Sequence, residues 1–502
     1  MSSAILWAPL AFGLVGLLLP SRAVGWWATL GTVATLGLAV AAALGFDSGS
    51  SVLQYAVDEP WISGLGVDYS LGIDGLNLFL ILLTAVLWVG GVAFAAFREQ
   101  ERPKTFYFLM LVAETATLGA FLAQDLLLFV LFFDLMLVPF YFLFGAWGHD
   151  RSAEGGLTAS AATLKMIVYT LIGSLLMLVA AIATAVLAAD GGHVSFSLAY
   201  LSEHGLGHGS QQWIFWFFAA AFLVKMPAFL LHGWMPDAYR AAPLPALVVF
   251  SGVLAKVGAY GFLRVVLPLF PDATVEFQEV VLLISLASIL YGSVMAFTQT
   301  NVRLIAGYSS VAQLGFITAG IFALRADGSD GAVLQMVNHG LVVAPTFVIV
   351  ALLLERTGTE DIREMGGMAL RAPVLAALFL IVALATLAMP GSANFVGEFY
   401  ILNGLFQAKI VFAFVAISGV AMSAYYALRL YQGTMHNRRP EGLLSREIGA
   451  RDALVLVPLV LCIVSLALYP QLILERTAPK VQQTVARVQG GETPEAKLAS
   501  KP

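Results

Sequence analysis

The sequence predicts an all-α polytopic membrane protein with about fourteen transmembrane helices. Of its 502 residues, 60% are hydrophobic and 11% are charged, whereas a soluble globular chain carries about 25% charged residues. The mean hydropathy is +0.87. Apolar runs of roughly 20 residues, the length that crosses a bilayer, recur from one end of the chain to the other. The number of spans, and not a soluble core, therefore sets the size of this protein.

Fourteen apolar runs are long enough to be read as helices, and two of them are interrupted by proline. Their approximate ranges are 4–19, 26–45, 76–97, 105–122, 125–147, 163–189, 212–231, 243–264, 276–297, 302–324, 331–354, 372–402, 410–433 and 452–470. The interruptions fall at Pro227 in the seventh run and Pro390 in the twelfth. The two runs lie five helices apart, so they cross the membrane in opposite directions. Paired broken helices predict two inverted five-helix repeats with a site at the breaks.

These runs divide the chain into five parts. Residues 1–104 hold three helices and an acidic loop at 46–75, in which we expect a short hairpin. The two repeats are assigned to 105–267 and 268–435. A last helix lies within 436–474, and we expect 475–502 to be a polar, poorly ordered tail.

Loop charges predict the orientation, because cytoplasmic loops carry the excess of Lys and Arg. One set of alternate loops has fourteen such residues and the other, with the tail left out, has Arg264, Arg325 and Lys409. The larger set is therefore placed in the cytoplasm, and both termini face the other side. Its members are Arg22, Arg98, Arg102, Lys104, Arg151, Arg240, Arg303, Arg356, Arg363, Arg371, Arg438, Arg439, Arg446 and Arg451.

Several classes of site lack sequence support. The single cysteine, Cys462, allows neither an intrachain disulfide nor a four-cysteine iron–sulfur site. There is no phosphate-binding glycine loop, no zinc-type spacing and no basic patch for nucleic acid. We therefore predict no metal and no redox centre in this chain. His193, His204 and His208 share one external loop; a solvated loop is the favoured reading, and a metal site there is the alternative.

Ionisable residues inside the apolar runs are few and are the main functional candidates. Each costs about 2.5–3.5 kcal/mol on insertion scales, and such residues mark ion paths or proton relays. We expect Asp134 to pair with Lys225, which stands two residues before Pro227. Lys256, His339 and Glu398 would continue the line. Secondary candidates are Glu114, Lys165 and His232.

A structural role for these charges is the alternative, because buried ion pairs can serve packing alone. For Arg429, near a cytoplasmic helix end, a side chain reaching toward the membrane surface is the better explanation.

From about Tyr69 to Tyr469 the chain resembles the antiporter-like membrane subunits of respiratory complex I. The acidic Glu398 on helix twelve resembles the M type, because the L and N types usually have lysine there. The length agrees with the M type, because the L type has a long lateral helix after span fourteen and no such run exists here. The motifs that carry the resemblance are Val224-Lys225-Met-Pro227, His232-Gly-Trp-Met-Pro236-Asp237-Ala238, Ala255-Lys256-Val-Gly-Ala-Tyr260-Gly, Asn338-His339-Gly-Leu and Met389-Pro-Gly-Ser-Ala-Asn394-Phe-Val-Gly397-Glu398-Phe.

The resemblance implies a non-redox subunit of a proton-translocating NADH:quinone oxidoreductase in the bacterial inner membrane. NADH, FMN, iron–sulfur clusters and quinone would be held by partner subunits, and L-, N- and K-type subunits would be its membrane neighbours, with lipid around them. The family's proton path falls on Asp134, Lys225, Lys256, His339 and Glu398.

Three positions depart from the family pattern, which usually has Glu at Asp134 and often has His at Gln313 and Tyr239. The runner-up is a subunit of an Mrp-type sodium/proton antiporter. A third reading is a membrane scaffold without transport.

Overall fold

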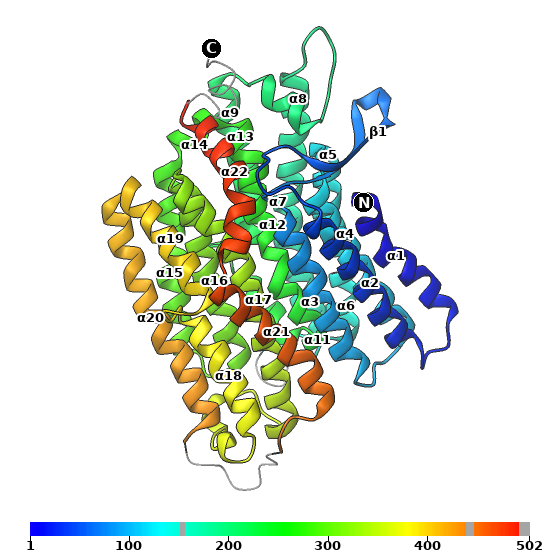
Figure 1. The fold of residues 1–502 in the computed structure, drawn as a ribbon, viewed down its shortest axis with the longest axis vertical. Coiled ribbons are helices and arrows are strands. Elements are labelled where there is room, and N and C mark those ends of the chain that lie inside the picture. The colour runs from blue at the N-terminus through cyan, green and yellow to red at the C-terminus, as the bar shows by residue number, and fades with distance from the viewer. Residues whose placement is uncertain (151–155, 438–445, 491–502) are drawn as a thin grey trace.

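A computed structural model describes residues 1–150, 156–437 and 446–490. Long helices run along one common axis of the molecule, with a single small hairpin at one end (Figure 1). In the described part of the chain, eleven helices are long and apolar enough to cross a membrane, and α1 and α18 are shorter apolar helices. The predicted all-α polytopic class is therefore confirmed.

The first half of the chain contains the hairpin and the first interrupted helices. Its elements are α1 (Ser2–Leu18), α2 (Val24–Leu44), β1 (Gln54–Ile62), β2 (Val67–Ile73), α3 (Leu78–Ala96), α4 (Pro103–Leu122), α5 (Leu126–Leu135), α6 (Leu137–Trp147), α7 (Ala159–Leu187), α8 (Leu198–Glu203), α9 (His208–Lys225) and α10 (Met235–Ala241). The eighth span is built from α11 (Leu244–Val249), η3 (Phe250–Leu254), α12 (Ala255–Gly261), η4 (Phe262–Val266) and α13 (Leu267–Leu269), where η3 and η4 are π-helical turns.

The second half of the chain consists of helices and ends with the helix α22. Its elements are α14 (Pro271–Glu276), α15 (Gln278–Thr298), α16 (Val302–Phe322), α17 (Ala326–Thr357), α18 (Pro373–Thr386), α19 (Ala393–Ala408), α20 (Ile410–Met435), α21 (Ala450–Leu468) and α22 (Gln471–Val488). Short 3-10 turns lie at Ser63–Leu65, Ile362–Glu364 and Met368–Leu370.

Each predicted run corresponds to a helix or an interrupted helix. The seventh run is α9, which ends at Lys225, followed by α10; the twelfth is α18 and α19. Both predicted breaks are thus confirmed. A break that we did not predict separates α5 from α6 at Met136, three residues before Pro139, which cannot donate a backbone hydrogen bond. The inverted-repeat relation between the two halves stays a prediction.

One end of the bundle collects the hairpin, α8 and α22 (Figure 1). Strands β1 and β2 pair antiparallel, as expected for the loop at 46–75. The N-terminus lies beside them, because the Ser2 hydroxyl donates to the Tyr55 carbonyl at 2.7 Å. Described basic residues meet at the other end, where Arg356 donates to the Arg446 carbonyl and Arg98 pairs with Asp452. Arg151, Arg438 and Arg439 lie outside the described residues.

The polar tail was predicted wrongly for its first part. Residues 471–488 form the regular helix α22, which packs against α17, α13 and α14. Its composition is polar, but the apolar side chains fall at helical spacing on one face. Packing of that apolar face against the bundle stabilises the helix, although its overall composition is polar. The buried residues are Ile473, Leu474, Thr477, Val481, Thr484, Val485 and Val488. Residues 491–502 lie outside the described part.

The centre of the bundle is the eighth span together with α16, both buried along their whole length, and α17, buried along most of it. Two arginines that we assigned to loops are inside this packing. Arg303 is fully buried and its guanidinium lies 2.6 Å from Glu360, while Arg264 lies 2.6 Å from Asp74. Their positions near span ends in the sequence gave no sign of these pairs, which join residues far apart in the chain.

Candidate functional site

The break between α9 and α10 is held open by specific hydrogen bonds. Pro227 has no N–H for the Leu223 carbonyl, so the Ala228 amide donates to it instead, at 2.9 Å. Leu230 turns the chain with a positive φ of 71°. The Trp234 indole reaches back and donates to the Val224 carbonyl at 3.0 Å. Backbone groups freed by the break therefore have partners, which a membrane interior requires.

Replacing Trp234 by Phe is expected to destabilise the break. The Val224 carbonyl would lose its donor inside the bundle, and a buried acceptor without a partner costs about 1–3 kcal/mol of unfolding free energy. Thermal unfolding of the detergent-solubilised protein would measure this loss. Trp213→Phe is the matched control, because Trp213 is 39% exposed on the outer face of α9. Equal midpoints for the two variants would contradict the capping role.

Lys225 lies at the broken end of α9 but does not reach the partner we predicted. Its Nζ donates to the Phe133 carbonyl at 2.8 Å and sits 3.8 Å from the centre of the Phe133 ring. Among the described residues it forms no direct ion pair with Asp134, the neighbour of Phe133, although the two charges interact at longer range. The expected direct contact is therefore replaced by one with the backbone beside the unpredicted break at Met136.

Asp134 faces the outside of the bundle. It lies in an apolar groove between α5, α6 and α7, together with Leu131, Tyr141 and Leu171. One of its carboxylate oxygens is buried and has no hydrogen-bond partner. A carboxylate in such a place is expensive unless something else covers the groove.

Lys256 lies next to the π-helical turn η3 in the eighth span. A π turn shifts the backbone hydrogen bonds by one residue and is frequent at functional sites. The fully buried Lys256 Nζ donates to the Ser251 carbonyl of that turn at 3.0 Å. Gly258 allows this helix to approach the break in α9, because a Cβ there would lie 2.9 Å from the Phe222 carbonyl. Gly258 beside Lys256 thus serves close helix packing.

At the second break, between α18 and α19, the turn at Met389–Gly391 is exposed, and the polar start of α19 is buried. Ala388 and Gly391 have positive φ values of 53° and 93°. The Asn338 amide on α17 donates to the Ala393 carbonyl at 2.7 Å, at the start of α19. Asn394 is fully buried and its side-chain amide has no partner. This break therefore faces α17 with polar groups.

Glu398 is the end of a buried hydrogen-bond chain that runs through Gln313. Its Oε1 accepts from the Gln313 amide at 2.8 Å, and the Gln313 carbonyl oxygen accepts from the Gln335 amide at 2.8 Å. Its other oxygen, Oε2, has no partner. Glu398 is 2% exposed. Gln313, which replaces a histidine of the family pattern, thus binds Glu398 directly and links α16, α17 and α19.

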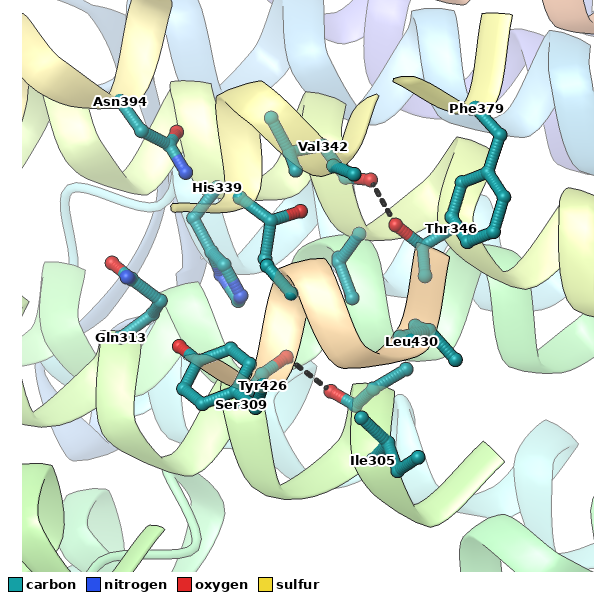
Figure 2. Close-up of a pocket in the computed structure, with 15 residues that line it drawn as sticks. Ile305, Ser309, Gln313, His339, Val342, Thr346, Phe379, Asn394, Tyr426 and Leu430 are labelled. Atoms are coloured by element: carbon teal, nitrogen blue, oxygen red, sulfur yellow. Dashed lines mark hydrogen bonds between the residues drawn. The ribbon is translucent and has the colours of Figure 1, made fainter. Parts of the chain in front are cut away.

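His339 and Gln313 line the same internal cavity, with Asn394 and Tyr426 (Figure 2). About 20 Å³ of it is open to the centre of a water molecule, and about 10–15 Å³ is enough to hold one water. His339 Nδ1 and the Tyr426 hydroxyl are buried without a partner. His339 is also within electrostatic range of Lys256. The cavity therefore offers a water site between the lysine side and the Glu398 side.

Of the five predicted relay residues, Lys256 lies within electrostatic range of His339 on α17, and Gln313 and Gln335 connect Glu398 to α16 and α17. Lys225 instead contacts Phe133, next to Asp134 at the periphery. Of the secondary candidates, Lys165 pairs with Asp237 at 2.7 Å and is partly exposed. Glu114 is fully buried with both carboxylate oxygens unpartnered. His232 packs against the rings of Tyr291 and Tyr308.

Sequence reasoning missed Gln335, Asn394 and Tyr426. The first lies one turn before His339 on α17, a spacing that could have been noticed. Tyr426 gave no signal, because it comes from the distant helix α20.

The three loop histidines do not meet at one point. His193 and His204 contact the Tyr200 ring, while His208 lies 3.2 Å from Glu276. In the part of the chain that the structure describes, no group of three or more His, Cys, Asp or Glu side chains is placed to hold a metal.

Comparisons with known proteins agree over nearly the whole chain. The family model described as NADH:quinone oxidoreductase/Mrp antiporter, TM, matches residues 123–423. NADH-quinone oxidoreductase subunit M of Rhodobacter capsulatus is 36% identical over 470 residues, 92% of this chain and 90% of that protein.

Two solved structures share the fold. Respiratory complex I from Thermus thermophilus with bound NADH contains a chain with a TM-score of 0.89 at 29% identity, covering 97% of this chain and all of that one. The Mrp complex from Dietzia matches with a TM-score of 0.83 over 97% of this chain and 99% of that one; at 20% identity this likeness shows the fold alone. With more than half of its length inside the family model and a relative above 30% identity, this chain belongs to the NADH:quinone oxidoreductase/Mrp antiporter family of membrane subunits.

Proposed function

We propose that this chain is the M-type, proton-translocating membrane subunit of an NADH–quinone oxidoreductase. The observation that carries the proposal is the buried polar line from His339 through the cavity and Gln313 to Glu398. Ionisable groups at this depth mark proton relays. In the proposed path Lys225 and Lys256 hold and release protons on one side of α17, His339 and cavity water pass them on, and Glu398 takes them at the second break.

The proposed partners are other membrane subunits of the complex. Asp134 supports this proposal. Its carboxylate lies in an apolar groove, and a carboxylate that faced only lipid there would carry a high free-energy cost. A neighbouring subunit covering the groove would supply polar contacts and extend the line of charges beyond this chain. L-, N- and K-type subunits are the proposed neighbours, and the flavin, iron–sulfur and quinone chemistry is assigned to partner subunits.

The proposed localisation is a bacterial inner membrane, with both termini outside the cytoplasm. The hairpin, the N-terminus and α22 share one end of the bundle, and the loop residues Arg98, Arg356 and Arg446 meet at the other. Such a distribution fits the preference of Lys and Arg for cytoplasmic loops.

A subunit of an Mrp-type sodium/proton antiporter is the second candidate, and the Mrp fold match favours keeping it. The two differ in their energy source. For the oxidoreductase subunit, deleting the gene is expected to abolish NADH-driven proton uptake into inverted vesicles and leave sodium-driven proton movement unchanged. Pull-down of the tagged chain is expected to recover NADH–quinone oxidoreductase activity. Loss of sodium-driven movement with intact NADH-driven uptake would contradict the proposal and favour the antiporter.

A further inference from the structure

A second group of buried charges lies away from the proposed relay, beneath α22 at the end of the bundle that carries the hairpin. It contains Asp74 after β2, Arg264 in the turn η4, and Asp330 on α17. Asp74 is 1% exposed, and Arg264 and Asp330 are each 7% exposed. The function proposed above uses none of these three residues, although burying each of them is expensive.

Asp74 and Arg264 form the fixed half of this group. Arg264 Nη2 lies 2.6 Å from Asp74 Oδ1, and its Nε donates to the Tyr260 hydroxyl at 2.8 Å. Tyr260 in turn donates to the Phe121 carbonyl at 3.0 Å. Lys256, Tyr260 and Arg264 follow one another at four-residue spacing along the eighth span, so one face leads from the proposed relay to this end of the bundle.

Asp330 is the free half of the group. Its Oδ1 is buried without a hydrogen-bond partner, and no cation pairs with it among the described residues. It precedes His339 by nine residues on α17, which is about 13 Å along a helix axis. An unpaired carboxylate at this depth, between the proposed relay and the water outside, can take up a proton and give it up again.

The same segment of α22 covers both halves. The Thr477 hydroxyl lies beside the Asp330 carboxylate. The Arg476 carbonyl and the Thr477 Cα press on Gly75, where an added Cβ would lie 2.2 and 3.1 Å from them. Lys480 is within electrostatic range of Asp74. The segment 476–480 of α22 is therefore a lid of one helical turn over two buried carboxylates.

We propose that Asp330, under this lid, is the group through which the subunit releases protons on the outer side. The carboxylate accepts a proton arriving from the centre of the bundle, becomes a neutral carboxylic acid, and passes the proton to outside water. The carboxylate then returns, so no other bond changes. Asp74 does not serve this role, because its ion pair with Arg264 holds it charged. This proposal rests on the proton-translocating function proposed above.

The test uses the complete complex in inverted vesicles and measures protons moved per NADH oxidised. Asp330→Asn is expected to lower proton movement about tenfold, since a positioned proton-transfer group contributes about 10²–10⁴-fold and water replaces part of it. Asp330→Glu keeps the carboxylate and is expected to retain most of the activity. Glu279→Gln is the matched control: the Glu279 side chain is 63% exposed and pairs with Lys409 at the surface.

Each outcome decides the proposal. Wild-type proton movement in assembled Asp330→Asn overturns it, as does equal loss in Asp330→Asn and Asp330→Glu, which would indicate packing. If Asp330→Asn does not assemble, the isosteric Thr477→Val decides: lowered proton movement supports the role, and unchanged movement overturns it. Loss of proton movement in Lys225→Ala alongside wild-type Asp330→Asn would leave the proposed function standing while removing this inference.

Discussion

A complex carrying Lys225→Ala is expected to assemble, to oxidise NADH and to move far fewer protons. Lys225 is 4% exposed and is the charged group at the end of α9, where Pro227 interrupts the helix. Alanine removes the ammonium without adding volume. The Phe133 carbonyl loses one donor, which costs about 1–3 kcal/mol, a loss that a chain with this much buried surface is expected to tolerate. Proton movement per NADH oxidised should fall by about tenfold or more.

The measurement is the quenching of a pH-sensitive dye in inverted vesicles, normalised to NADH oxidation and to the amount of assembled complex. Lys409→Ala is the control, because Lys409 pairs with Glu279 at the surface, where an ion pair contributes about 0–1 kcal/mol. Lys225→Arg keeps the positive charge but cannot release a proton, so it tests whether the charge alone is sufficient. If assembled Lys225→Ala moves protons like the wild type, Lys225 is not in the path. If neutral variants change assembly alone, the scaffold reading gains support.

The fold could be predicted from the sequence because two simple rules apply to helices in a bilayer. Spanning segments must be apolar and about 20 residues long. A proline inside one removes a backbone donor and favours a break, although Pro345 lies inside the continuous helix α17. Both rules act locally, so Pro227 and Pro390 predicted their breaks without knowledge of neighbours. The hairpin in the loop at 46–75 was also predictable, as an acidic segment between two spans.

The contacts between helices were not readable, because they depend on how distant elements meet. Lys225 was expected to bind Asp134, but the break at Met136 presents the Phe133 carbonyl to it. Gln313 was noted only as a departure from the histidine of the family pattern, and the structure shows that its amide binds Glu398. Helix α22 was expected to be unstructured, because its overall composition is polar. For Lys225 and Gln313 the partner across the bundle decided the outcome. For α22 the helical spacing of its apolar residues was a local signal that the polar composition outweighed.

Glu398→Gln is expected to stop proton movement while leaving the hydrogen-bond chain in place. Gln313 donates to Glu398 Oε1 at 2.8 Å, and a glutamine carbonyl oxygen can accept the same bond. The amide cannot take up and release a proton as a carboxylate does. A purely structural Glu398 would therefore tolerate the change, whereas a relay group would lose about tenfold or more in protons moved per NADH oxidised.

A surface carboxylate provides the control for Glu398→Gln. Glu279→Gln alters the same functional group at a side chain that is 63% exposed, and it should leave proton movement unchanged. Glu398→Asp should keep partial activity, since it retains the carboxylate but shortens its reach to Gln313. Wild-type proton movement in Glu398→Gln would place the path elsewhere, with the fully buried and unpartnered Glu114 as the next carboxylate to test. The glutamine variant thus separates charge from shape at a relay position where Gln313 is a neutral donor and one carboxylate oxygen has no partner.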